Sequence, residues 1–383
     1  MPLAGSMIYS RYISRLRLTN FRNYTAAALD LDRRHVVLTG PNGAGKTNLL
    51  EAVSVLSPGR GLRGASFETM QAQGSDQGWA VAATVETEDG ASDIGTGSAP
   101  GEAGRRVRIN GANARSMEAM SDYLRVLWLT PGMDGLFSGP ASERRRFLDR
   151  LVTTLIPGHS AIVSDFEKVM RQRNRLLEED GDPTWLGAIE AQMAELAAAI
   201  HLSRADSLGH LQALIAESLD DANFPAAHLA LTPLFEDRAE PLSSSALEAE
   251  LAGLWGRSRG LDRAAGRTIS GPHRVDLDVT YAQKGMPAAL GSTGEQKALL
   301  IGLILAHARL VKARTGITPF LLLDEIAAHL DPDRRRALFQ ALDGLGTQCF
   351  LTGTDPLLFE ALGDRAQRIT VRDGRLFPGP SGP

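Results

Sequence analysis

Cysteines and long hydrophobic runs are nearly absent from this 383-residue sequence. With a single cysteine, Cys349, the chain can form neither an intramolecular disulfide nor a cysteine-based zinc site. No apolar run approaches the ~20 residues that a membrane helix needs, so we expect no transmembrane helix and no membrane partner. The first residues, 1–11, lack the continuous apolar core of a signal peptide. These absences favour the cytoplasm.

An excess of positive charge is also missing, because the net charge is −4 and the pI is about 6.1. A protein that binds DNA in every state is usually basic, since contacts to phosphates supply most of its affinity. Any binding to nucleic acid must therefore depend on local basic patches, including patches that form in only one conformational state. The length itself predicts roughly two to three domain-sized units.

A glycine-rich loop follows a short apolar stretch near the start of the chain. Residues 40–48 spell G-P-N-G-A-G-K-T-N, after a predicted strand at 35–39 and before a predicted helix at 46–56. Strand, loop and helix in this order form the context that a phosphate-binding loop requires. Its glycines let backbone amides approach phosphates, and the start of the following helix favours negative charge.

We therefore predict an ATP site with Mg²⁺ at this loop. Lys46 is expected to reach the β- and γ-phosphates, and the hydroxyl of Thr47 to ligate Mg²⁺. The predicted nucleotide-binding residues of the loop are Gly40, Pro41, Asn42, Gly43, Ala44, Gly45, Lys46, Thr47 and Asn48.

A second apolar strand, predicted at 320–323, ends in the pair Asp324 and Glu325. The end of such a strand places the Asp324 carboxylate beside the metal, as a second protein ligand. Glu325 would orient and polarise the attacking water, as phosphoryl transfer requires of a base. Lys46 and Glu325 are thus the predicted catalytic residues.

Residues 291–295 spell G-S-T-G-E and precede a predicted helix at 296–309. They resemble the signature motif of the ABC-type ATPases, whose common form is Leu-Ser-Gly-Gly-Gln. The resemblance implies that Ser292 and Gly294, the two retained positions, bind the γ-phosphate held by the other subunit of a dimer. A helix that is merely capped by its serine is the alternative interpretation.

Two elements of that family are not recognisable. Residues 352–355, T-G-T-D, stand where a switch histidine normally follows the next strand, and no glutamine that would sense the γ-phosphate lies near Thr130. We therefore expect slow hydrolysis. Turnover like that of a transport ATPase would contradict this expectation.

The loop and the signature motif stand far apart, so one ATPase head is assembled from both ends of the chain. We predict an α/β head at residues 1–131 and 271–383, with an inserted, mostly helical second lobe at 132–270. A helix at 183–219 would be the longest of this lobe. The insert is too long for a transporter subunit and far too short for the coiled-coil arms of the SMC ATPases.

Two further predictions concern local structure. The segment 87–104 is rich in Gly, Ser, Ala and acidic residues, which predicts an exposed turn or loop. Residues 276–281 alternate in a way that predicts a strand, which we assign to the head.

Four stretches carry a closer resemblance: 18–24 (L-T-N-F-R-N-Y), 48–52 (N-L-L-E-A), 143–149 (E-R-R-R-F-L-D) and 270–277 (S-G-P-H-R-V-D-L). In these stretches the chain is similar to the RecF family of bacterial recombination-mediator ATPases. The resemblance implies an SMC-like head that dimerises on ATP and binds gaps and single-strand/double-strand DNA junctions. It also implies RecR and RecO as partners in loading recombinase, with roles in DNA repair, replication restart and the SOS response, and a weak, DNA-dependent ATPase that resets the dimer.

Clusters of arginines provide candidate DNA contacts, for which a solvated face or an intramolecular ion pair is the alternative. These candidates are Arg105, Arg106, Arg108, Arg144, Arg145, Arg171 and Arg175. For the whole protein, the alternatives are an ATP-gated nuclease and an ATP-dependent scaffold that carries a RecF-like head.

Overall fold

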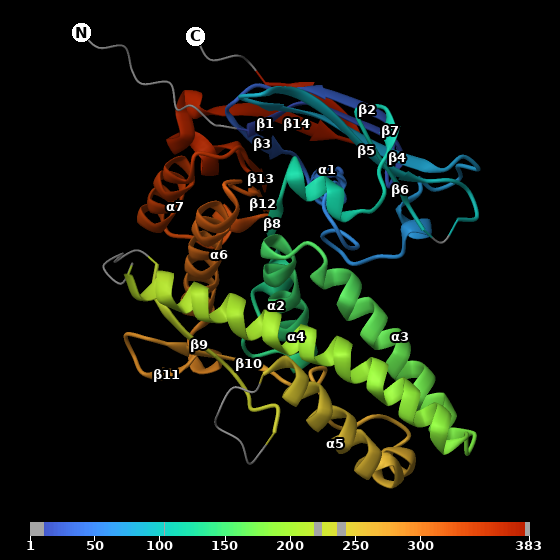
Figure 1. Ribbon diagram of the computed structural model, residues 1–383. Helices are drawn as coiled ribbons and strands as arrows, with labels where there is room; N and C mark the ends of the chain where they lie inside the picture. Colours follow the sequence, from blue (N-terminus) through green and yellow to red (C-terminus); the bar gives the residue numbers. More distant parts are fainter. Residues whose placement is uncertain (1–10, 103, 218–223, 236–242, 380–383) are drawn as a thin grey trace. The chain divides into compact units, whose positions relative to one another are not determined.

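The computed structural model describes residues 11–102, 104–217, 224–235 and 243–379, and the chain divides into two compact units (Figure 1). The first unit holds Met1–Gly135, Asp221–Phe224 and Ser292–Pro383, and the second holds Leu136–Asp220 and Pro225–Gly291. The start of the chain, on which the prediction about a signal peptide rests, lies outside the described residues except for Arg11.

An antiparallel sheet of the first unit has the strand order β2-β1-β4-β5-β6-β7. The strands are β1 (Arg11–Phe21), β2 (Tyr24–Asp30), β4 (Trp79–Thr87), β5 (Gly90–Ser98), β6 (Arg106–Ile109) and β7 (Ala112–Asn113). The prediction of an exposed loop at 87–104 was wrong in part, because β5 pairs with β4 along its whole length. Its alternation of small residues suits a strand between two neighbours, and composition alone hides this.

A second sheet of the first unit has the order β15-β14-β3-β13-β12-β8 and is parallel except for β15 at one edge. Its strands are β3 (His35–Thr39), β8 (Val126–Leu129), β12 (Phe320–Leu323), β13 (Cys349–Gly353), β14 (Ala366–Arg372) and β15 (Arg375–Pro378). Strands β3, β13, β12 and β8 are buried throughout, which explains their largely apolar sequences. This sheet joins strands from both ends of the chain.

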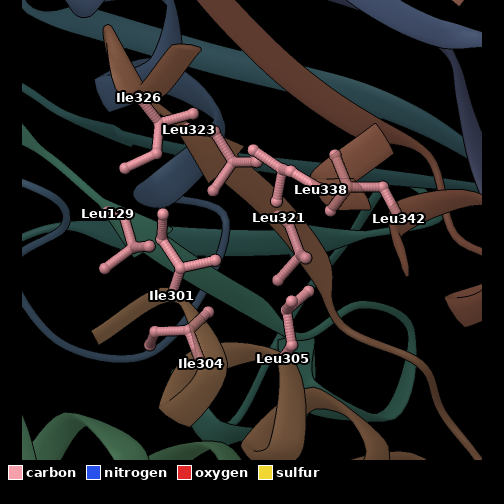
Figure 2. A pocket seen from close by; sticks show the side chains of 9 residues that line it. All are labelled: Leu129, Ile301, Ile304, Leu305, Leu321, Leu323, Ile326, Leu338 and Leu342. Atoms are coloured by element: carbon pink, nitrogen blue, oxygen red, sulfur yellow. The ribbon is translucent and has the colours of Figure 1, made fainter. Parts of the chain in front are cut away.

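Helices α1 (Lys46–Ser54), α6 (Thr293–Thr315) and α7 (Pro332–Leu345) complete the first unit, together with short 3₁₀ turns. Figure 2 shows an apolar layer in which side chains of α6 and α7 face those of β8 and β12. Its members are Leu129, Ile301, Ile304, Leu305, Leu321, Leu323, Ile326, Leu338 and Leu342. The layer fixes the helix that carries the signature motif onto the strand that leads to Asp324.

The 3₁₀ turns of the chain are η1 (Phe67–Met70), η2 (Glu118–Asp122), η3 (Pro131–Met133), η4 (Ala288–Leu290), η5 (Ile326–His329) and η6 (Pro356–Arg365).

The second unit is mostly helical, with α3, α4 and α5 side by side (Figure 1). Its helices are α2 (Ala141–Leu155), α3 (His159–Glu178), α4 (Pro183–Glu217) and α5 (Ser244–Ala265). Residue 219, the predicted end of the long helix, lies outside the described residues. Phe166, Met193, Leu251 and Trp255 are central members of the apolar core between these helices.

A small sheet in the second unit differs from our expectation. The strand predicted for the head, here β10 (Leu277–Tyr281), pairs instead with β9 (Ala227–Leu231) and β11 (Met286–Pro287). Because β10 pairs with β9, residues up to 291 belong to the second unit. The boundary between the second unit and the last part of the first unit therefore falls at 291/292 rather than at the predicted 270/271. The first division, after Gly135, lies close to the predicted one at 131/132.

None of the helices in the described part of the chain is both long and apolar enough to cross a membrane.

A buried histidine at the start of β3 makes the stability of the first unit depend on pH. His35 accepts a hydrogen bond from the Cys349 amide at Nδ1 (3.2 Å), and its Nε2 lies 3.1 Å from Asp343 Oδ1. Both contacts suit the neutral ring that donates from Nε2. Burial, with a smaller effect of the nearby Arg365 charge, lowers the pKa of His35 from 6.5 to about 4.

We expect the free energy of unfolding to fall by about 2 kcal/mol between pH 7 and pH 5 because of His35. Since the folded pKa lies below the unfolded one, the unfolded state takes up its proton first as the pH falls below about 6.5. His35→Gln should flatten this dependence, measured by urea unfolding at both pH values. The matched control is His228→Gln at an exposed position. Equal pH dependence in all three proteins would contradict the assignment.

Candidate functional site

The predicted glycine loop and acidic pair lie at one edge of the second sheet. β3 runs into the glycine loop at Gly40, β12 runs into Asp324, and β13 lies between these two strands. Because the strands are parallel, their carboxyl ends meet at the same edge, which is where open α/β sheets bind ligands. Sequence segments from the two ends of the chain therefore form one site within the first unit.

The glycine loop has a shape that only glycine allows at two positions. Gly40 has φ 152°, and a Cβ there would lie 2.1 Å from the carbonyl oxygen of Val371. Gly45, at the start of α1, has φ 115°, and a Cβ there would lie 2.6 Å from Asn23 Nδ2. The loop is thus held against its neighbours, with its amides at the amino end of a helix, an arrangement that binds anions.

The turn between β1 and β2 supports the loop from behind. The Tyr24 hydroxyl donates to the Gly45 carbonyl (3.0 Å), and Asn23 Nδ2 donates to the Ala44 carbonyl (3.3 Å). Asn23 also accepts a hydrogen bond of 2.7 Å from Asn48 Nδ2. Burial raises the pKa of Tyr24 far above its usual value, so its hydroxyl stays a donor. The sequence stretch 18–24 pointed to a family resemblance, but its role behind the loop was not predicted.

A buried carboxylate fixes helix α1 itself. Glu51 is fully buried and accepts a bidentate pair of hydrogen bonds from Arg22, at 2.9 and 2.7 Å. Arg63 binds the same carboxylate and also donates to Asn48 Oδ1 at 2.7 Å. Such bidentate, charge-assisted contacts are geometrically specific. They hold the helix whose start forms the anion-binding end of the loop.

Lys46 points its ammonium group into the loop. Its Nζ donates to the carbonyl oxygens of Gly40 (2.7 Å) and Pro41 (3.0 Å), and the residue is buried. Burial lowers the pKa of Lys46, while the carboxylates of Glu325 and Asp324 act in the opposite direction. The site thus places a partly desolvated cation beside two carboxylates, which is a suitable arrangement for binding a phosphate chain.

Oxygen ligands suited to a metal ion converge beside this ammonium group. Thr47 Oγ1 donates to Asp324, with distances of 3.1 and 3.0 Å to its two carboxylate oxygens. A hydroxyl and a carboxylate at a phosphate-binding loop form the kind of all-oxygen set that Mg²⁺ prefers. The residues therefore fit Mg²⁺, and Glu325 follows next in the chain at the same edge of the sheet.

Ser292 and Gly294 lie exposed at the start of α6, as a site completed by a second chain requires. The Ser292 hydroxyl accepts from the Glu295 amide (3.4 Å) and donates to the Glu295 carboxylate (3.0 Å), while the Ser292 amide donates to that carboxylate at 2.8 Å. This is a capping box. It gives Glu295, which departs from the usual glutamine, a local structural role.

An ion pair with a buried lysine joins α6 to the segment after β8. Lys297 Nζ lies 3.1 Å from Asp134 Oδ2, and the lysine side chain is only 5% exposed. The segment starts beside the metal-ligand candidate, because the amide of Asp324 donates to the Leu129 carbonyl (2.9 Å). The segment from Leu129 to Asp134, near which the sequence has no glutamine, thus contacts both Asp324 at the end of β12 and Lys297 of α6.

The prediction that Arg105 contacts DNA was wrong. Its buried guanidinium donates to the carbonyl oxygens of Val55, Ser57 (2.6 Å) and Gly59 (3.0 Å). Burial lowers the pKa of Arg105 to about 10. This arginine braces the chain after α1, so no surface remains for a phosphate.

Arg144 also belongs to an intramolecular pair rather than to a free basic patch. It donates to Asp276 at 3.0 and 2.6 Å and to the Gly139 carbonyl at 2.6 Å, within the second unit. We therefore withdraw it as a DNA contact. Arg145, its neighbour, is half-buried, and burial lowers its pKa.

Four further DNA candidates are exposed, and these four and Arg145 stay predictions. Arg106 and Arg108 project from β6, where Arg106 pairs with Glu102 and Arg108 donates to Asn113 (3.2 Å). On α3, exposed Arg171 lies 3.9 Å from Glu167 and exposed Arg175 lies 2.9 Å from Glu179, just past the end of the helix. Exposed pairs of this kind cost little to exchange for a phosphate.

The fold and this edge of the sheet define an ATPase head of the SMC and ABC type. A sequence model described as "RecF/RecN/SMC N terminal domain" matches residues 12–376. The DNA replication and repair protein RecF of Rhizobium leguminosarum bv. trifolii is 56% identical over 95% of this chain and 98% of its own length. The RecF protein of Rhizobium meliloti is 53% identical over 97% of this chain and 100% of its own length.

The chain belongs to the RecF family of DNA replication and repair proteins. Among solved structures, that of the recombination mediator protein RecF-ATPrS in the RecFOR pathway covers 97% of this chain and 99% of its own, with a TM-score of 0.84. Its sequence identity is 22%, so it supports the fold: an α/β head with a largely helical second unit.

Gly45→Ala should lower the affinity for a fluorescent nucleoside triphosphate at least tenfold, since the new Cβ collides with Asn23 and Tyr24 behind the loop. Gly74→Ala is the matched control, because Gly74 has φ 80° but no atom within 4 Å of a new Cβ. Both changes carry a strain of roughly 1–2 kcal/mol at positive φ. Equal nucleotide affinities in the two variants would show that the contacts behind the loop do not shape the site.

Proposed function

We propose that this protein is an ATP-dependent DNA clamp of the RecF type. The observation that carries the proposal is the convergence, at one edge of the parallel sheet, of the loop 40–48, Lys46 and the contact between Thr47 and Asp324. Strands from both ends of the chain meet there. The family membership and the RecF-ATPrS structure among its structural neighbours support ATP as the nucleotide.

Each residue has a distinct role in this proposal. Loop amides and Lys46 bind the phosphates of ATP, and Thr47 and Asp324 hold Mg²⁺, which when bound draws charge from the phosphate oxygens. Glu325 orients the attacking water and accepts its proton, while Lys46 stabilises charge that develops on the γ-phosphate. These residues make the protein an ATPase that yields ADP and phosphate.

A second copy of the chain completes the site. Ser292 and Gly294 of that copy bind the γ-phosphate through the exposed start of α6, so bound ATP favours the homodimer. Hydrolysis removes the shared phosphate and releases the dimer. Slow, DNA-stimulated hydrolysis fits this switch, because the ATP-bound dimer then stays on DNA for a long time before it dissociates.

The clamp binds gapped DNA and single-strand/double-strand junctions in the cytoplasm. Dimerisation would join the exposed arginines of two copies, Arg106 and Arg108 among them, into a larger basic surface. Such a surface would attract DNA phosphates despite the net charge of −4. With RecR and RecO, the partners that the family resemblance implies, the clamp promotes recombinase loading, gap repair, replication restart and SOS induction.

Glu325→Gln should trap the clamp on DNA, because it preserves the site's shape while removing the base. We expect ATP hydrolysis to fall about 10²–10³-fold, as for the loss of one key electrostatic group. Fluorescence anisotropy with gapped and fully duplex DNA, in ATP, ADP or no nucleotide, should show that the variant stays bound to gapped DNA in ATP. Lys46→Arg is the control that should lose ATP-dependent binding.

Different outcomes would favour the alternatives. DNA affinity that is the same with ATP, ADP and no nucleotide, in wild type and in Glu325→Gln, would indicate an ATP-dependent scaffold. It would also fit a protein whose partner, rather than the protein itself, binds the DNA. Cleavage of the labelled DNA in the same reactions would indicate a nuclease. Either result would contradict the clamp.

Neutralising Arg106 or Arg108 should weaken ATP-dependent DNA binding and lower the slope of log affinity against log salt by about 1 per residue. Each variant, Arg106→Gln and Arg108→Gln, is titrated at several salt concentrations. Glu102→Gln is the matched control, since it removes the ion-pair partner of Arg106 and leaves the arginine free. Unchanged slopes in both arginine variants would remove β6 from the DNA-binding surface.

A further inference from the structure

A buried hydroxyl connects the two acidic residues of the site. Thr352 Oγ1 donates to Asp324 Oδ1 at 2.6 Å and accepts a hydrogen bond of 3.0 Å from the backbone amide of Glu325. Thr352 is only 1% exposed. One side chain thus contacts both the proposed metal ligand and the residue proposed to activate water.

The sheet register explains why Thr352 can do this. β13 lies between β3 and β12, and Leu351 pairs with Leu323, so Thr352 stands beside the position that follows β12, which is Asp324. On its other side, Thr352 pairs with Leu38, two residues before the glycine loop. The central strand of the site therefore presents its last buried side chain between the loop and the acidic pair.

The directions of the two hydrogen bonds are fixed by chemistry. The Glu325 amide can only donate, so the Thr352 oxygen accepts there and its single proton is free for the carboxylate. That carboxylate also accepts from Thr47. Hydroxyl groups on both sides thus set the orientation of Asp324 without adding charge.

The backbone of Glu325 needs such support. Glu325 has φ 52°, a left-handed conformation that costs a non-glycine residue roughly 1–2 kcal/mol. The amide hydrogen bond to Thr352 stabilises this turn, which directs the Glu325 side chain as the chain leaves the sheet. Strain of this kind persists where the surrounding structure determines it, and it is concentrated at functional sites.

We propose that Thr352 is the positioning residue of this site, which holds the Asp324 carboxylate and the Glu325 backbone in register with each other. This inference rests on the proposed function, in which Asp324 holds Mg²⁺ and Glu325 activates water. Thr352 lies in the segment where the related ATPases have their switch histidine. It acts through its two neighbours and needs no contact with the nucleotide.

Thr352→Ser and Thr352→Ala form a matched pair that both lack the methyl group and differ only in the hydroxyl, and Thr352→Val adds an isostere without hydroxyl. Thr154→Val controls for the loss of a buried hydroxyl elsewhere, because Thr154 Oγ1 donates to the Leu151 carbonyl within α2. Two readouts separate the roles: kcat and KM for ATP, and the Mg²⁺ concentration at which a fluorescent ATP analogue binds half-maximally. Thermal unfolding reports whether each variant is folded.

For Thr352→Ala and Thr352→Val we expect at least a tenfold loss of kcat and a several-fold higher Mg²⁺ requirement, in line with the loss of a hydrogen bond to a charged group. Nucleotide affinity in EDTA and KM should change little, and Thr352→Ser and Thr154→Val should stay near wild type. If Thr352→Val does not fold, the serine and alanine pair decides.

Equal kcat and Mg²⁺ requirement in the serine and alanine variants would overturn the inference, since only the hydroxyl separates them. A loss confined to thermal stability would also overturn it. If the wild type hydrolyses no ATP, the proposed function fails, but the Mg²⁺ dependence of nucleotide binding still tests Thr352. A normal wild-type ATPase with unaffected Thr352→Ala would leave the proposed function standing and reject this inference alone.

Discussion

Parallel pairing of β13 with both β3 and β12 is the constraint on which the site depends. β3 lies near the start of the chain, at His35–Thr39, and β12 and β13 come from its last fifth, yet their carboxyl ends share one edge of one sheet. Because that edge is common, the glycine loop, Asp324 and Thr352 lie within hydrogen-bonding distance of one another or of a shared partner. In the sequence, the second unit lies between β3 and β12.

Hydrogen bonds from the turn between β1 and β2, together with ion pairs on α1, hold the glycine loop in one conformation. Asn23 and Tyr24 hold its carbonyl oxygens, and Glu51 receives two arginines on the helix that follows. None of these groups needs to contact a nucleotide. They hold the backbone whose amides form the anion-binding end of the loop.

The sequence was sufficient to predict the strand, glycine loop and helix around residues 40–48, the strand ending in Asp324, the helical second unit and the family. These features depend on local patterns: glycines between a strand and a helix, and an apolar run followed by two acids. Thr352 was noticed only as a departure from a motif, because its role depends on the register between β12 and β13, which no local pattern encodes. Arg105 was counted among the DNA candidates because it stands in a cluster of arginines, and the sequence does not reveal that its guanidinium turns inward to three carbonyl oxygens.

The proposed dimer depends on ATP shared between two chains, and the mass of the protein in solution tests this most directly. Sedimentation equilibrium of the wild type and of Ser292→Ala, each in ATP and in ADP with Mg²⁺, would give that mass. We predict a dimer only for the wild type in ATP, since the variant lacks the hydroxyl that binds the γ-phosphate from the second chain. A mass that is the same in ATP and ADP, or a Ser292→Ala variant that dimerises like the wild type, would contradict the account.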